Sequence, residues 1–132
     1  MSTIERLLRE RPRPSLMPGM QRILSLPTRR DDGFDLTRQY SRRDRGTYSL
    51  RPIQSLALQQ IKNNNGLVAP IGVGHGKFLI SALAASALKA NRPLLLVPPS
   101  LVKQTEKEIA RFREHFVIPS NLQVLSYGKL SV

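Results

Sequence analysis

The pattern of apolar and polar residues divides the chain into two parts, with the change near residue 49. Residues 1–48 mix short apolar stretches with arginines, prolines and acids. Such a composition buries too little apolar surface to offset the entropy lost on ordering. We therefore predict a mostly irregular arm, with a short helix near its start that ends at Pro12. The periodic apolar pattern of a folded domain begins only after it, in residues 49–132.

Helices and buried strands alternate in the pattern of this second part. Short apolar runs predict strands at residues 66–70, 94–97 and 122–126. Apolar residues at helical spacing predict helices at residues 50–62, 78–90, and 100 to 112 or 116. Strands that alternate with helices form parallel sheets through right-handed crossovers. We therefore expect an α/β fold, with a parallel sheet of about three strands and flanking helices.

Local sequence signals predict where these helices begin and end. Pro52 falls in the first turn of the first helix, which is a favoured place for proline. Gly66 follows three asparagines and suits a left-handed cap at the end of that helix. Ser100 follows Pro98 and Pro99 and is the expected N-cap of the third helix.

The chain is strongly basic, with 21 Lys and Arg against 9 Asp and Glu and a net charge of +12. Such a charge favours an anionic partner, such as nucleic acid or a nucleotide. The chain has no cysteine, which excludes disulfides, thiolate catalysis and cysteine-based zinc sites. It also has no apolar run long enough to cross a bilayer and no secretory signal. We therefore expect no membrane partner.

A glycine-rich loop between a predicted strand and a predicted helix is the clearest chemical signal. The loop is Gly72-Val73-Gly74-His75-Gly76-Lys77. Glycines let backbone N–H groups surround a phosphate, and a helix N-terminus adds a favourable field. The nominal phosphate-loop pattern is not met, because Ile71 stands where its first glycine belongs and Phe78 replaces its Ser or Thr. An ordinary tight turn is the alternative.

Four segments, in order, resemble motifs of one protein family. They are Leu-Arg-Pro-Ile-Gln at 50–54, the loop at 70–77, the apolar and proline-rich stretch at 94–102, and Leu-Ser-Tyr-Gly-Lys-Leu at 125–130. Together they resemble the start of the first RecA-like lobe of superfamily-two helicases and translocases, closest to Swi/Snf-type remodelling ATPases and related phage helicases. The resemblance covers about 80 residues. It implies a partial RecA-like lobe over residues 49–132, preceded by the arm.

The resemblance implies ATP as the cofactor and nucleic acid, with DNA favoured, as a partner. Its nucleotide-binding residues would be Arg51, Gln54, Gly72, Val73, Gly74, His75, Gly76, Lys77 and Phe78. In this scheme Gln54 reads adenine, the loop amides hold the β-phosphate and Lys77 bridges the β- and γ-phosphates. Residues near a nucleic-acid strand would be Pro99, Ser100 and Lys103. The alternatives are solvent-facing helical positions for Gln54 and Lys103.

The groups that hold magnesium in such ATPases are missing from this sequence. Phe78 has no hydroxyl, and Ser81 lies one helical turn further along. No aspartate follows Asp44, so the acidic box is absent. Magnesium binding is therefore not expected, and we predict no ATP hydrolysis by the chain alone at motor-like rates, above about 1 per second. Whether the chain acts as an enzyme stays open.

Several functions fit these observations. One is a nucleotide-binding fragment of a helicase-like ATPase, truncated before the acidic box and completed by further chain or a protein partner. Another is a nucleic-acid-binding or assembly protein that reuses a degenerate lobe, with the arginine arm and Phe34, Tyr40 and Tyr48 contacting the nucleic acid. In this second function the arm contributes to nucleic-acid binding. The alternative for the arm is a solvated linker. We expect a cytoplasmic or nucleoid-associated protein, and the resemblance makes a phage genome one expected source.

Overall fold

The computed structural model describes residues 17–25, 27 and 34–130. The chain forms two compact units, Met1–Arg30 and Asp31–Val132. In the first unit, helix α2 spans Pro18–Leu24, and Ser25 Oγ donates to Arg22 O at 2.8 Å just after it ends. The sequence pattern predicted irregular chain for these residues, and the helix α2 differs from that prediction. The short helix expected before Pro12 lies outside the described residues.

The second unit includes residues 34–48, which the sequence pattern assigned to the arm. Helix α3 spans Thr37–Tyr40, and its Tyr40 is only 4% exposed. The Leu36 N–H donates to Ser55 Oγ at 3.0 Å, and the Val117 N–H donates to Tyr40 O at 2.8 Å. Residues 34–48 are therefore held by partners far away in the sequence, which local composition does not reveal.

Hydrogen bonds of Asp35 and Thr37 stabilise the start of residues 34–48. Asp35 Oδ1 accepts hydrogen bonds from both the Thr37 hydroxyl and the Thr37 N–H. These bonds favour the charged carboxylate, so the pKa of Asp35 lies below its usual value. Thr37 Oγ1 also accepts from the Leu50 N–H at 2.8 Å. The segment is thereby tied to the residue that leads into the next helix.

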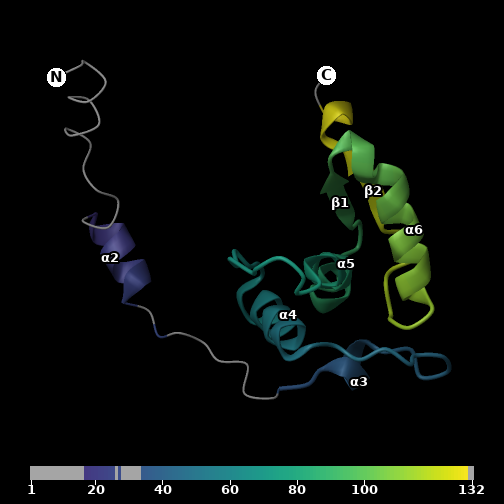
Figure 1. Cartoon of the computed structure of the whole chain (residues 1–132), viewed down its shortest axis with the longest axis horizontal. Helices are drawn as coiled ribbons and strands as arrows, with labels where there is room; N and C mark the ends of the chain where they lie inside the picture. The colour runs from purple at the N-terminus through teal and green to yellow at the C-terminus, as the bar shows by residue number, and fades with distance from the viewer. Residues whose placement is uncertain (1–16, 26, 28–33, 131–132) are drawn as a thin grey trace. The chain divides into compact units, whose positions relative to one another are not determined.

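The second unit contains a two-stranded parallel sheet (Figure 1). Strand β1 spans Leu94–Val97 and strand β2 spans Gln123–Ser126, in a register that runs from Leu94↔Gln123 to Val97↔Ser126. The crossover between them contains the 3-10 helix η2, Pro99–Leu101, and helix α6, Val102–Arg113. A second 3-10 helix, η3, follows β2 at Tyr127–Lys129. The predicted α/β class and parallel pairing are confirmed.

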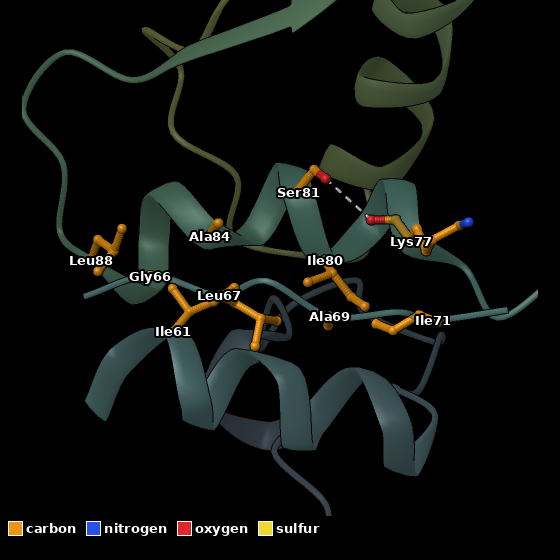
Figure 2. Close-up of a pocket in the computed structure, with 10 residues that line it drawn as sticks. All are labelled: Ile61, Gly66, Leu67, Ala69, Ile71, Lys77, Ile80, Ser81, Ala84 and Leu88. Carbon is orange, nitrogen blue, oxygen red and sulfur yellow. Dashed lines mark hydrogen bonds between the residues drawn. The ribbon is translucent and has the colours of Figure 1, made fainter. Parts of the chain in front are cut away.

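The prediction of a strand at residues 66–70 is wrong. These residues form no strand and are all exposed, with Val68 100% exposed. β1 and β2 pair with each other, so the segment has no neighbouring strand to satisfy its backbone. An apolar run signals burial or a strand locally, but it does not encode the partner that a strand requires. Figure 2 shows the segment passing between helices α4 and α5 instead.

Three longer helices form near the predicted places. α4 spans Pro52–Asn64, α5 spans Lys77–Ala87, and α6 follows η2. Two predicted caps are wrong. The left-handed residue after α4 is Asn65, with φ 55°, and not Gly66. Ser100 lies inside η2, so Leu101 is the N-cap residue of α6.

The hydrophobic core gathers side chains from α3, α4, α5 and α6 and from the chain after α6. Leu58 on α4, Leu83 on α5 and Phe116 are its largest fully buried apolar side chains. α4 packs against α5, and α6 packs against β2 (Figure 1). Tyr40 joins this core, and burial raises the pKa of its phenol. Among the described residues, no helix is long and apolar enough to span a membrane.

Candidate nucleotide-binding site

The glycine-rich loop connects the extended segment 66–71 to the start of α5. Gly74 and Gly76 adopt left-handed backbone conformations, with φ 82° and 71°. Gly76 is also the N-cap residue of α5. Within the described part of the chain, the backbone N–H groups of residues 72–76 donate to no acceptor. The loop therefore presents a run of free, exposed donors next to a helix N-terminus.

Two side chains at the start of α4 hold the carbonyl groups of this loop. The Arg51 guanidinium donates to Gly74 O. Gln54 Nε2 donates to Gly76 O at 3.0 Å, while Gln54 Oε1 accepts from the Arg51 N–H at 2.8 Å. These contacts satisfy two of the loop carbonyls, and the N–H groups of residues 72–76 donate to no acceptor in the described part of the chain.

Gln54 is only 4% exposed, and its amide has a partner at each end. The geometry therefore gives Gln54 a role in positioning the loop. The resemblance implied that Gln54 reads adenine; the amide keeps a second N–H donor and a second acceptor lone pair for this, but the residue is buried. The burial of Gln54 excludes the alternative that its side chain faces solvent on the helix.

The cations of the site have no acidic partner. Lys77 is exposed as the first residue of α5, and Arg51 is exposed at the N-cap of α4. Among the described residues, the ion pairs are those of Asp44 with Arg42 and Arg45. Lys77 and Arg51 are therefore free to neutralise a bound anion. His75 lies in the same loop, with its ring near Gly72.

Phe78, at the position where the family pattern has a hydroxyl, is a packing residue. Its ring centroid lies 6.0 Å from that of Phe112, which in turn lies 6.4 Å from that of Phe116. Ser81 Oγ donates to Lys77 O at 3.3 Å, and in Figure 2 its side chain points away from the segment 66–71. In the described part of the chain, no group of three or more His, Asp or Glu could hold a metal. The residues present do not fit magnesium.

Three cavities surround the loop. An apolar cavity of about 400 Å³ lies between α5 and the segment 66–71, where Ile80 points toward Ala69 and Ile71 (Figure 2). A cavity of about 410 Å³ lies on the Gly72 and His75 side. The third, of about 460 Å³, adjoins Gly76, and we call it the aromatic pocket. It is lined by Thr47, Tyr48, Ser49, Arg51, Gln54, Gly76, Phe78, Leu79, Glu108, Phe112 and Phe116.

The predicted nucleic-acid residues lie elsewhere. Pro99, Ser100 and Lys103 are exposed and directly follow β1, at the carboxyl edge of the sheet. None of the three lines a cavity around the loop. The structure therefore brings the phosphate-loop candidates together with α4 and leaves these three residues as a separate surface.

A stacked pair of rings that no sequence pattern predicted lies beside the site. The rings of Tyr48 and His115 are parallel to within 13°, with centroids 3.7 Å apart. His115 Nδ1 also lies 3.1 Å from Thr47 Oγ1. The pair fixes residues 47–48, which form one wall of the aromatic pocket. The partners are more than 60 residues apart, so no local pattern predicts their contact.

No protein-family model matches this chain, and neither a curated protein nor a solved structure matches it.

Proposed function

We propose that the chain binds the phosphates of a nucleotide at residues 72–77, as a partial RecA-like lobe of a helicase-like ATPase. The observation that carries the proposal is the run of N–H groups at 72–76 that donate to no acceptor among the described residues, in a loop whose Gly74 and Gly76 carbonyls accept from Arg51 and Gln54. Two left-handed glycines shape the loop, and Lys77 adds a positive charge that forms no ion pair with any described residue. This is the chemistry of a phosphate cradle.

The helicase resemblance makes ATP the nucleotide of this proposal. The parallel crossover β1–α6–β2 supports the RecA-like assignment. Phe78 has no hydroxyl, Ser81 donates to Lys77 O, and no group of three or more metal-ligating side chains occurs among the described residues, so the proposal is binding without hydrolysis by this chain alone. Turnover would need groups from further chain or from a protein partner.

Replacing Lys77 with alanine should weaken nucleotide binding by about tenfold or more, because hydrogen bonds to charged groups contribute about 1.5–3 kcal/mol. The measurement is a titration of the purified chain with a fluorescent ATP analogue. Lys62→Ala is the matched control, because it removes the same charge from an exposed position at the end of α4. Absence of binding, or equal losses in both variants, would rule the proposal out.

Nucleic-acid binding by the basic surface is the second candidate function. Arg43 and Lys103 are exposed and form no ion pair with a carboxylate among the described residues. Stacking on bases is less well supported, because Tyr40 is buried and Tyr48 is stacked on His115. We expect phosphate-dominated binding to a DNA oligonucleotide that weakens steeply as salt rises and does not respond to ATP. Affinity that is independent of salt would count against it.

A further inference from the structure

A cavity lined by two arginines lies at the end of α6, and we call it the arginine cavity. Its volume of about 400 Å³ falls within the usual range for ligand pockets. Among the described residues, no acidic side chain and no residue of the loop at 72–77 contributes to its lining. The cavity is therefore positively charged and distinct from the loop. Its lining residues are Arg42, Arg113, Phe116, Val117, Ile118 and Ser120.

Arg113, the last residue of α6, is half-buried and has no counter-charge. Its Nη2 donates to Pro119 O at 2.8 Å and to Ser120 O at 3.4 Å. Because Ser120 also lines the cavity, these bonds place the charged end of Arg113 there. Its Nε is buried without a hydrogen-bond partner, and the group forms no ion pair with a described carboxylate. A half-buried charge of this kind is stabilised when an anion binds beside it.

Arg42 brings a second guanidinium to the cavity from a distant part of the chain. Its backbone N–H donates to His115 O at 2.9 Å, and its Nη1 donates to Arg113 O at 3.1 Å. Its Nη2 bonds to no described residue. Its Nε lies 3.5 Å from Asp44 Oδ1 in an exposed ion pair, a weak kind of interaction. Arg42 therefore keeps donors for a ligand.

We propose that the arginine cavity binds a backbone phosphate of a nucleic-acid strand; the inference rests on nucleic-acid binding, the second candidate function. Guanidinium groups donate paired N–H bonds to phosphate oxygens, and two such groups meet here. Ser120 is exposed at the same cavity, and its hydroxyl adds a further donor. The apolar part of the wall strengthens the attraction, because low-dielectric walls focus the field of the charges.

The residues around Arg42 favour a polyanion over a small free ion. Arg43 and Arg45 flank the cavity residue in the sequence and are exposed, and Asp44 is the one acid among residues 42–45. A strand with one phosphate in the cavity thus passes near further positive charge. Contacts of this type fix the position of a nucleic acid without reading its sequence.

The first test measures the affinity of the full chain for a fluorescent DNA oligonucleotide at several salt concentrations. Arg42→Gln should weaken binding about tenfold, because charged hydrogen bonds to phosphate are lost. It should also reduce the slope of log affinity against log salt by about one. Arg92→Gln is the matched control, because Arg92 is exposed, forms no ion pair with a described residue and does not line the cavity. The control should bind as the unaltered chain does.

The second test follows the Nε–H signal of Arg113 in nuclear magnetic resonance spectra of the ¹⁵N-labelled chain, assigned by its absence in Arg113→Lys. A saturable shift on titration with the oligonucleotide is the expected result. A shift with inorganic phosphate but not with DNA would assign the cavity to a small anion and overturn the proposal. The spectrum of the unaltered chain decides even if Arg42→Gln fails to fold.

The two tests separate the cavity from nucleic-acid binding in general. If DNA binds but Arg42→Gln and Arg92→Gln lose affinity equally, the cavity is overturned and nucleic-acid binding by the basic surface stands. If DNA does not bind at all, both are overturned.

Discussion

Replacing Phe116 with alanine is expected to lower the free energy of unfolding by about 3–5 kcal/mol, the usual cost of truncating a buried aromatic residue. Phe116 is 1% exposed and contacts the ring of Phe112. It also forms an antiparallel bridge with Ser41, at the point where residues 34–48 join the core. A loss of this size is a large share of the about 5–15 kcal/mol that stabilises a typical domain.

Urea denaturation followed by circular dichroism measures this effect. Val117→Ala is the control, because Val117 is the neighbouring residue and its side chain is 53% exposed. The control should change the free energy of unfolding by about 0.5 kcal/mol or less. Similar losses in the two variants would show that Phe116 is not in the core of this unit.

Replacing Gly76 with alanine is expected to reduce nucleotide affinity by about 5- to 30-fold, because a left-handed conformation costs an L-residue about 1–2 kcal/mol. The glycine has φ 71°, and a Cβ added there would lie 2.3 Å from Gln54 Nε2. Gln54 cannot move aside without losing its bonds to Arg51 and Gly76. The loop must therefore change shape, which moves the N–H groups that would contact the phosphates.

Gly66→Ala provides the matched control for this substitution. Gly66 has no positive φ, and a Cβ added there would meet nothing within 4 Å. The control should bind the fluorescent nucleotide as the unaltered chain does. If Gly76→Ala binds equally well in the same titration, the loop geometry is irrelevant to binding, and the site lies elsewhere.

Periodicity in the sequence predicted the elements whose stability is local. α4, α5 and α6 carry apolar residues at helical spacing, and the runs at 94–97 and 122–126 are the strands β1 and β2. Their parallel pairing follows from the helix between them, because such a crossover brings strands together in parallel.

Elements that depend on distant partners could not be predicted in this way. The run at 66–70 is as apolar as a strand, yet no strand lies beside it. Tyr40 is in a polar stretch, yet it is buried because its backbone meets Val117 and its side chain joins the core. No sequence pattern within a few residues of 66–70 or of Tyr40 predicts the exposure of the first or the burial of the second.

In the candidate site, too, the sequence predicted the local features and not those that depend on distant partners. The glycine loop and its lysine were visible in the sequence, and the structure places them at the start of α5. The resemblance linked Gln54 and Arg51 to the nucleotide, while the structure shows that they also hold the loop itself. The wall made by Thr47 and Tyr48 depends on the contacts of these two residues with His115, which follows α6, and was not predicted.

The most direct measurement of the central claim is a nuclear magnetic resonance titration of the ¹⁵N-labelled full chain with a nucleoside triphosphate. If the loop binds the phosphates, the amide signals of residues 72–77 should show the largest saturable shifts, because their N–H groups gain acceptors. Amides in β2, which already donate within the sheet, should change little. Saturable shifts confined to the arginine-rich residues 38–45, with residues 72–77 unchanged, would contradict the account.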